Sequence, residues 1–96
     1  MTRIFLSDKV KTDFDRIFDF LFEFAPDTAA RRIEEIVAAI DVLQTSPRIG
    51  RPVALGQREL VISQGGGYLA LYRFDPIHDI AYVLAVKSQR ERDYKT

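Results

Sequence analysis

Residues 43–52 read LQTSPRIGRP, and the spacing of hydrophobic residues changes across this stretch. Before it, apolar residues recur every three or four positions, which is typical of one face of a helix. After it, they alternate in short runs bounded by glycine, proline and aspartate, which is typical of strands and turns. The stretch itself is predicted to form a loop from Ser46 to Pro52, because it contains Pro47, Gly50 and Pro52. It separates a helical half of the chain from a strand half.

Two helices are predicted before this loop. The first runs from Asp8 to about Phe24, where apolar residues recur at helical spacing. Pro26 breaks the pattern, and the second helix runs to about Gln44. We expect Asp27 or Thr28 to cap this second helix. Because the break is so short, the two helices should form an antiparallel hairpin.

Four strands are predicted. The first is residues 3–6 (RIFL), which directly precede a helix N-cap signal at Ser7. The others follow the loop, at Arg58–Ser63, Tyr68–Phe74 and Ile80–Ser88, with QGGG and DPIHD between them as hairpin turns. These elements predict an α+β fold, with an N-terminal strand and the antiparallel helical hairpin packed on a small antiparallel sheet of about four strands. We expect residues 1–96 to form a single domain.

Composition argues against several classes of function. With 14 basic and 14 acidic residues the formal net charge is zero, so we expect no direct, specific DNA binding. Cysteine is absent, which excludes disulfides and thiolate metal sites. No apolar run approaches the roughly 20 residues that span a membrane, and the start of the sequence lacks a signal-peptide pattern. We therefore expect a soluble, cytoplasmic protein with no membrane partner.

The usual motifs of catalysis are weak in this sequence. His78 is the only histidine and lies in a predicted turn beside Asp75 and Asp79, where a solvated turn residue explains it better than a metal ligand does. The glycines at 65–67 lack the lysine and hydroxyl residue of a phosphate-binding loop, so they are interpreted as a hairpin loop. Solvation and pairing one helical turn apart explain the carboxylates. No metal and no cofactor are expected.

The first predicted helix has an apolar face wider than one packing partner needs. Its central stripe consists of Val10, Phe14, Ile17 and Leu21. Phe20 and Phe22 flank this stripe and widen the apolar arc to about 200°. We expect these two rings to lack a partner in the core, which would suit the docking of an amphipathic helix. The alternative is a core helix that is simply more hydrophobic than it needs to be.

A polar set lies on the later predicted strands and on the residues after them. It comprises Arg58, Arg73, Lys87, Ser88, Arg90, Arg92 and Tyr94. Cations around a tyrosine could stabilise phosphate charge during RNA cleavage, with Tyr94 positioning the 2′-hydroxyl or accepting its proton. The alternative is a solvated cluster that pairs with itself, because Glu91 and Asp93 lie between the arginines. Composition alone favours this second interpretation.

The order of these motifs resembles a known family. A strand, a helical hairpin ending in LQTSPRIGRPV, and then RELVI, GYLALYRFD and VLAVKSQRERDY are similar to the RelE/ParE toxins of type II toxin-antitoxin systems. The resemblance covers almost the whole chain and is closer to ParE than to RelE. It implies a bacterial protein that inhibits the growth of its own cell and that a cognate antitoxin neutralises.

The resemblance implies one of two mechanisms: RelE-like toxins are ribosome-dependent mRNA endonucleases, and ParE-like toxins block DNA gyrase. In RelE-like enzymes an arginine follows the Gly-Tyr pair, but here that position is Leu69, and the preceding strand has no lysine. Arg90 matches the arginine of the RelE tail and Tyr94 resembles its tyrosine, so a ribonuclease would use Arg90, Tyr94 and Arg58. Because half of the catalytic set is missing from an electrically neutral chain, we favour gyrase inhibition by binding, with no confident catalytic residue.

Two sets of contact residues, and one further alternative, follow from the resemblance. The residues expected to contact gyrase are Lys87, Arg90, Arg92 and Tyr94. Antitoxins of this family wrap an extended or helical C-terminal segment over the toxin. The residues expected to contact such a segment are Phe20, Phe22, Phe24 and Arg73. An inactive protein that serves only as an antitoxin-binding co-repressor also stays open.

Overall fold

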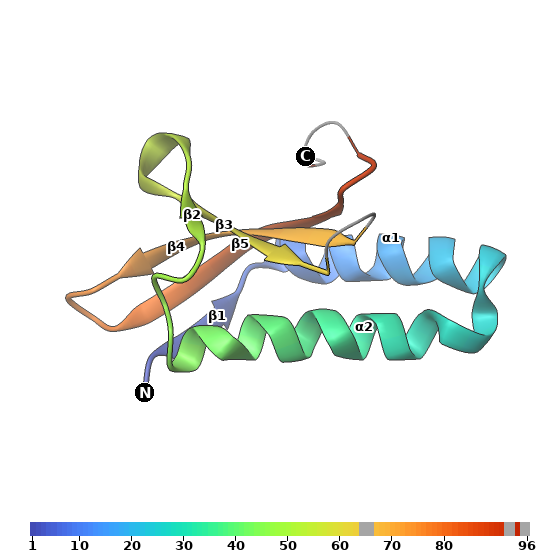
Figure 1. The fold of residues 1–96 in the computed structure, drawn as a ribbon, viewed down its shortest axis with the longest axis horizontal. Helices are drawn as coiled ribbons and strands as arrows, with labels where there is room; N and C mark the ends of the chain where they lie inside the picture. Colours follow the sequence, from blue (N-terminus) through green and yellow to red (C-terminus); the bar gives the residue numbers. More distant parts are fainter. Residues whose placement is uncertain (64–66, 92–93, 95–96) are drawn as a thin grey trace.

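The computed structural model describes residues 1–63, 67–91 and 94. Its elements are β1 (Arg3–Leu6), α1 (Asp8–Phe24), α2 (Pro26–Asp41), η1 (Val42–Gln44), β2 (Arg51–Pro52), η2 (Ala54–Gly56), β3 (Arg58–Ile62), β4 (Tyr68–Asp75) and β5 (Ile80–Ser88). The two helices form an antiparallel hairpin on one face of the sheet (Figure 1). The predicted α+β class is therefore confirmed.

The sheet has five strands in the order β1-β5-β4-β3-β2, and it is mixed. Strand β1 is parallel to β5, whereas the other neighbours are antiparallel. The prediction of an antiparallel sheet of about four strands is thus corrected in two details. Strand β2 has only two residues, too few to show a period of two. The orientation of β1 depends on the long crossover through both helices, which local sequence does not encode.

The helix boundaries show which local signals dominate. As predicted, Ser7 caps α1, and its hydroxyl accepts from the Val10 N–H at 3.3 Å. Helix α2 begins at Pro26, so the expected cap at Asp27 or Thr28 is wrong. Proline suits the first turn of a helix, because the N–H that it lacks would have no partner there. After residue 41 the α-helix gives way to a single 3₁₀ turn that ends at residue 44.

The core lies between the helices and the sheet. Its fully buried members include Val10, Ile36, Leu43, Ala70, Tyr72, Ala81, Val83 and Val86. The register of β4 against β5 shifts between Leu71 and Tyr72, which pair with Ala85 and Val83, so Leu84 is an extra residue in β5. Because side chains alternate along a strand, this bulge changes which residues face the helices. Val86 joins the core, and its neighbour Lys87 falls on the opposite face.

The loop that separates the two halves of the chain is held by a buried tyrosine. The Tyr72 hydroxyl donates to the Pro47 carbonyl at 2.7 Å and accepts from the Gly50 N–H at 2.9 Å. The Arg58 guanidinium donates to the carbonyls of Arg48 and Gly50, at 3.1 and 2.8 Å. A Cβ at position 50 would lie only 2.6 Å from a ring carbon of Tyr72, so this position requires glycine.

Replacing Gly50 with alanine is therefore expected to lower the free energy of unfolding by about 1–3 kcal/mol, because the new methyl group overlaps the Tyr72 ring. Urea denaturation would measure the change. The same substitution in a Tyr72→Leu background should cost less, since the overlapping ring is absent. Equal penalties in both backgrounds would show that the contact with Tyr72 is not the cause.

Candidate functional site

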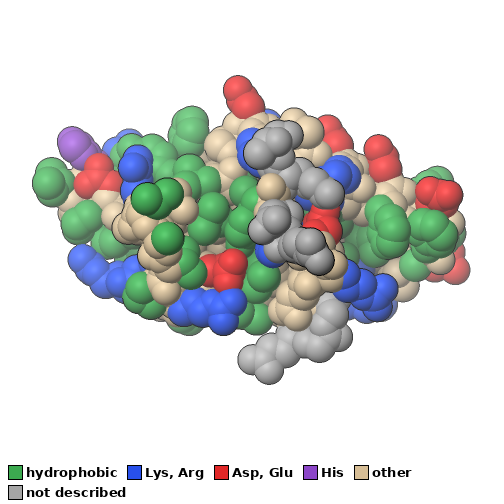
Figure 2. All heavy atoms as spheres, turned by 90° about the horizontal axis from the view of Figure 1, so that it is seen from above, with side chains coloured by type: hydrophobic (Ala, Val, Ile, Leu, Met, Phe, Trp, Pro, Cys, Tyr) green, Lys and Arg blue, Asp and Glu red, His purple; other side chains and the backbone are tan. Residues whose placement is uncertain are grey.

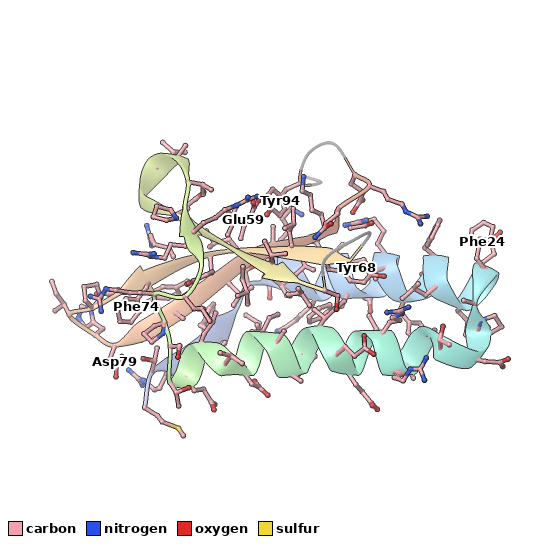
Figure 3. All side chains as sticks on the ribbon, viewed as in Figure 1. Phe24, Glu59, Tyr68, Phe74, Asp79 and Tyr94 are labelled. Carbon is pink, nitrogen blue, oxygen red and sulfur yellow. The ribbon has the colours of Figure 1, made fainter. Side chains whose placement is uncertain are left out.

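The sheet face opposite the helices is here called the open face, and Figure 2 views the molecule from this side. Of the polar set, Lys87 and Tyr94 lie on this face. In this view hydrophobic side chains gather towards both ends of the molecule, and basic side chains are spread along it. The Tyr94 hydroxyl donates to Glu59 Oε2 at 2.7 Å, and Figure 3 shows the two side chains meeting above the sheet. Arg51 Nε donates to the other Glu59 oxygen at 3.0 Å, and Lys87 Nζ lies 5.0 Å from the Tyr94 ring centroid. Three polar side chains, those of Arg51, Lys87 and Tyr94, therefore gather around Glu59.

This arrangement changes the acidity of both central groups. Burial raises the pKa of the Tyr94 phenol, and the hydrogen bond to Glu59 raises it further. Burial alone would raise the pKa of Glu59, but hydrogen bonds from Arg51 and Tyr94 outweigh it and hold that pKa below its usual value. A phenol that is harder to ionise is a poorer proton acceptor near neutral pH. The geometry therefore suits Tyr94 as an anchor for the residues after β5 better than as a catalytic base.

The three candidate ribonuclease residues are not gathered into one site. Arg58 pairs with Tyr72 in the sheet, whereas Ser88, just before Arg90, pairs with Tyr68. Tyr72 and Tyr68 are four residues apart on β4, which corresponds to about 13 Å along a strand. The backbone positions of Arg58 and Arg90 are therefore far apart in the sheet. The Arg58 guanidinium is also occupied by loop carbonyls.

The expected gyrase-contact residues have unequal exposure. Lys87 is only 9% exposed, and its ammonium group donates to the Glu91 carbonyl at 3.2 Å. Lys87 therefore stabilises the backbone just after β5, and its ammonium group is not exposed for contact with a large partner. Arg90 is exposed. Arg92 lies outside the described residues. Among the described members of the set, Arg90 is the cation that a large partner could contact most directly.

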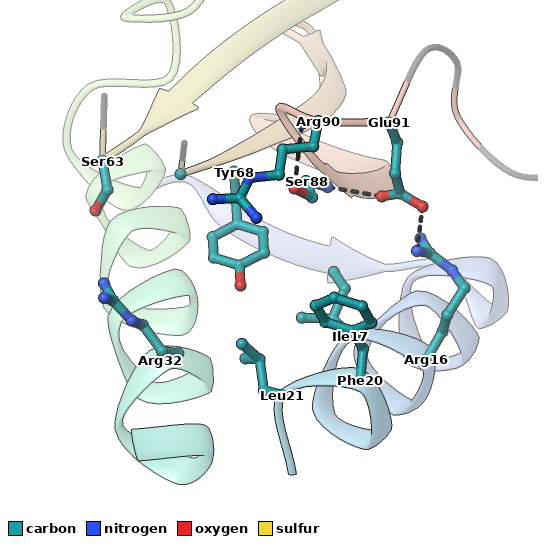
Figure 4. A pocket seen from close by; sticks show the side chains of 11 residues that line it. Arg16, Ile17, Phe20, Leu21, Arg32, Ser63, Tyr68, Ser88, Arg90 and Glu91 are labelled. Carbon is teal, nitrogen blue, oxygen red and sulfur yellow. Dashed lines mark hydrogen bonds and ion pairs between the residues drawn. The ribbon is translucent and has the colours of Figure 1, made fainter. Parts of the chain in front are cut away.

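A cavity of about 700 Å³ opens between the helical hairpin and the sheet, next to the start of β4 and the end of β5 (Figure 4). Its lining comprises Arg16, Ile17, Phe20, Leu21, Arg32, Ser63, Gly67, Tyr68, Ser88, Arg90 and Glu91. Apolar side chains from α1 form one wall, and Tyr68 projects into the space from β4. Basic side chains come from α1, α2 and the residues after β5. The cavity is therefore apolar inside and basic at its rim.

The phenylalanines of α1 continue the apolar surface beyond the cavity. Phe20 and Phe22 are each 58% exposed and Phe24 is 68% exposed, in agreement with the expectation that Phe20 and Phe22 lack core partners. The Phe20 and Phe24 rings contact each other, with centroids 4.8 Å apart, and Phe24 lies at the tip of the hairpin (Figure 3). Arg73 does not join them, because it lies over the Tyr82 ring on the open face.

A buried carboxylate links helix α1 to the sheet, and the sequence interpretation missed it. Asp13 is 1% exposed, and its carboxylate accepts from the Val86 N–H at 2.9 Å and from Lys9 Nζ at 2.9 Å. Arg16 lies 3.4 Å from the same carboxylate and also pairs with Glu91. The signal was present in the sequence, because Asp13 falls three residues after Val10 within the apolar stripe.

Two further features bear on the class of function. His78 lies in the turn between β4 and β5, where its Nδ1 is 2.7 Å from Asp75 Oδ2. In the described part of the chain, no group of three or more histidine, aspartate or glutamate side chains is placed to hold a metal ion. Neither described helix has the length and apolar character needed to cross a membrane.

Comparison with known proteins gives a family. Residues 4–93 match the family described as the ParE toxin of the type II toxin-antitoxin system parDE. No curated protein sequence matches the chain. The structure is similar to one from the chromosomal ParDE system of P. aeruginosa, with a TM-score of 0.79 and 23% identity over 92% of this chain and 96% of that one. It is also similar to a chain of the RelBE2 toxin-antitoxin complex of Mycobacterium tuberculosis, with a TM-score of 0.63 and 20% identity over 92% and 98% of the two chains.

The fold, with a helical hairpin against a five-stranded sheet, is that of the RelE/ParE toxins. Because the family match spans nearly the whole chain, the protein belongs to the ParE toxin family of type II toxin-antitoxin systems. The predicted relationship, closer to ParE than to RelE, is confirmed.

Proposed function

We propose that this toxin inhibits DNA gyrase by binding to it and that a cognate antitoxin neutralises it in the cytoplasm. The proposal rests on the family match together with one observation: two of the three side chains that RNA cleavage would need, those of Arg58 and Tyr94, are occupied by structural contacts. Tyr94 is bound to Glu59, and Arg58 is bound to loop carbonyls. A binding mechanism needs no such side chain to be free.

In this proposal Arg90 is, among the described residues, the one that makes the main contact with gyrase. Lys87 and Tyr94 act indirectly, because the lysine lies against the tyrosine ring and the tyrosine is fixed to β3 through Glu59. Together these contacts fix Glu91 and Tyr94 against the sheet. Arg92, which lies outside the described residues, is proposed as a further contact.

The proposed antitoxin surface is the exposed phenylalanine face of α1. Phe20, Phe22 and Phe24 each leave more than half of their surface uncovered, and contiguous exposed aromatic surface favours an apolar partner. The similar P. aeruginosa structure comes from a ParDE toxin-antitoxin system. Arg73 lies on the open face, so it would contact a different part of the antitoxin from the phenylalanines. No cofactor is required for either contact.

One observation favours a second candidate, a ribosome-dependent mRNA endonuclease. Arg51, Glu59, Lys87 and Tyr94 place two cations, a carboxylate and a phenol near one point of the open face. Such a set could hold an RNA phosphate and accept a proton from a 2′-hydroxyl, with Glu59 as the ionised base. Loss of toxicity on replacing Glu59 with glutamine, in a protein that remains folded, would support this candidate.

Pulse labelling of new DNA and new protein, minutes after the toxin is induced without antitoxin, separates the two candidates. We expect DNA synthesis to stop first and an SOS response to follow, because inhibited gyrase blocks replication. If protein synthesis stops first, the gyrase proposal is wrong and the endonuclease candidate replaces it. If neither process slows while the folded protein accumulates, the chain acts only as an antitoxin-binding co-repressor.

A further inference from the structure

The cavity between the helical hairpin and the sheet contains basic groups that the protein itself does not neutralise. Arg16 is engaged with Glu91, Asp13 and the Val86 carbonyl. Among the described residues Arg32 pairs only with Glu35, at 3.5 Å, and both side chains are nearly half exposed. Within the described part of the chain, no carboxylate lies within 4.0 Å of the Arg90 guanidinium. Two guanidinium groups at the rim therefore have unused capacity for an anion.

Tyr68 brings a hydroxyl group into the cavity that these two arginines also line. Its side chain projects from β4 into the cavity, and Arg90 extends over it from the residues after β5 (Figure 4). Arg32 lines the cavity from α2, and its side chain extends towards Ser63. Burial raises the pKa of Tyr68, the positive charges of Arg32 and Arg90 oppose the rise, and the negative charges of Glu35 and Glu91 add to it. The phenol therefore stays protonated at neutral pH and can donate a hydrogen bond.

The opposite wall of the cavity is apolar. Ile17 and Leu21 contribute aliphatic surface, and Phe20 adds an aromatic ring that is more than half exposed. A ligand that filled this space would bury apolar atoms against α1 while an acidic group met the rim. Neither an inorganic anion nor an uncharged hydrocarbon satisfies both walls.

We propose that this cavity binds an acidic peptide segment of the partner protein, with a large apolar side chain against Ile17, Phe20 and Leu21 and an adjacent carboxylate between Tyr68, Arg32 and Arg90. The inference deepens the proposed antitoxin contact and rests on it for the identity of the partner. The volume of about 700 Å³ accommodates a few side chains rather than a whole domain. Guanidinium groups and a phenol match a carboxylate, because all of them donate hydrogen bonds and two are positively charged.

A peptide titration tests the proposal without the natural partner. The probe is a capped amphipathic peptide with leucines along one face and glutamates beside them, and its twin carries glutamine in place of each glutamate. Calorimetry should show that the wild-type chain binds the glutamate peptide about tenfold more tightly than the glutamine peptide. Amide NMR shifts should place the peptide at Tyr68 and Ser88. Equal affinities, or shifts confined to other surfaces, would overturn the proposal.

Three variants and a matched control locate the carboxylate. Arg32→Gln, Arg90→Gln and Tyr68→Phe should each weaken binding of the glutamate peptide several-fold and leave the glutamine peptide unaffected. Arg31→Gln is the control, because it removes the same charge from an exposed neighbour of Arg32 that does not line the cavity. If Arg31→Gln weakens binding as much as Arg32→Gln does, a general charge effect replaces the proposed site.

The outcomes distinguish this inference from the function on which it rests. The titration contains neither gyrase nor antitoxin, so its failure would leave the pulse-labelling result intact. Tighter binding of a single-stranded RNA oligonucleotide than of the glutamate peptide would assign the cavity to nucleic acid and overturn the inference. A toxin that binds the glutamate peptide at Tyr68 but spares DNA synthesis would retain this site and lose the gyrase proposal.

Discussion

Replacing Asp13 with alanine is expected to lower the free energy of unfolding by about 3–5 kcal/mol, the largest change we expect from one substitution that removes no core hydrophobic group. The carboxylate accepts from the Val86 N–H at 2.9 Å and pairs with Lys9 and Arg16. Without it, a buried backbone donor of β5 loses its partner, and two cations lose their countercharge. For a domain of this size, 3 kcal/mol lowers the melting temperature by about 12 °C or more.

Thermal and urea denaturation of two further variants would isolate the buried interaction. Asp15→Ala removes an exposed carboxylate from the same helix, so it should change stability by less than about 0.5 kcal/mol. Asp13→Asn keeps an acceptor for the Val86 N–H but loses the charge, so it should fall between the two. If Asp13→Ala proves no more harmful than Asp15→Ala, the contact between α1 and β5 does not depend on this carboxylate.

Reversing the charge of Arg90 to glutamate is expected to abolish toxicity when the protein is produced without antitoxin. Arg90 is exposed, and its neighbours Lys87 and Tyr94 hold the chain in place beside it. A glutamate there would set a negative charge against the surface that the arginine is proposed to contact, and mismatched charge at an interface is costly. Viable counts and the rate of DNA synthesis after induction measure the effect.

Arg31→Glu provides the matched control, since it makes the same charge change at an exposed position on α2. We expect it to remain toxic. Circular dichroism would check that both variants keep the fold. Full toxicity of a folded Arg90→Glu protein would remove this residue from the mechanism, whatever the target is.

Arg90 belongs to two proposed surfaces, and this has a functional implication. It lines the cavity proposed for the antitoxin segment, and it is also the exposed cation proposed to contact gyrase. An antitoxin carboxylate held by Arg90 would occupy the group that is proposed to contact gyrase. Neutralisation would then follow from direct competition for one side chain.

Most elements of the fold could be predicted, because each has a strong local pattern. The apolar stripe of α1 and the alternation in β3 to β5 gave boundaries that agree with the structure to within about one residue. What could not be predicted depends on contacts between distant segments. The parallel pairing of β1 with β5 and the two-residue strand β2 arise only when the sheet assembles.

The candidate site was harder to predict than the fold, for the same reason. The exposure of Phe20 and Phe22 follows from one helix and was correctly expected. The contact between Tyr94 and Glu59 joins residues 35 apart in sequence, and no local pattern encodes it. The bulge at Leu84 also places the Lys87 side chain on the face opposite to the one that regular alternation predicts. As a result Lys87 lies on the open face, whereas Ser88 and Arg90 line the cavity.

The shortness of β2 has a consequence for how the free protein behaves in storage and in the cell. Strand β2 pairs with β3 only at Arg58 and Glu59. Within the described residues, no strand pairs with the outer edge of β3 at Leu60–Ile62. Pro52 and Arg51 protect the paired part of this edge against the addition of another strand, because proline offers no N–H and arginine carries a charge. The apolar remainder is a template on which another chain could add a strand. Concentrated toxin without its partner should therefore aggregate through this edge before its core unfolds.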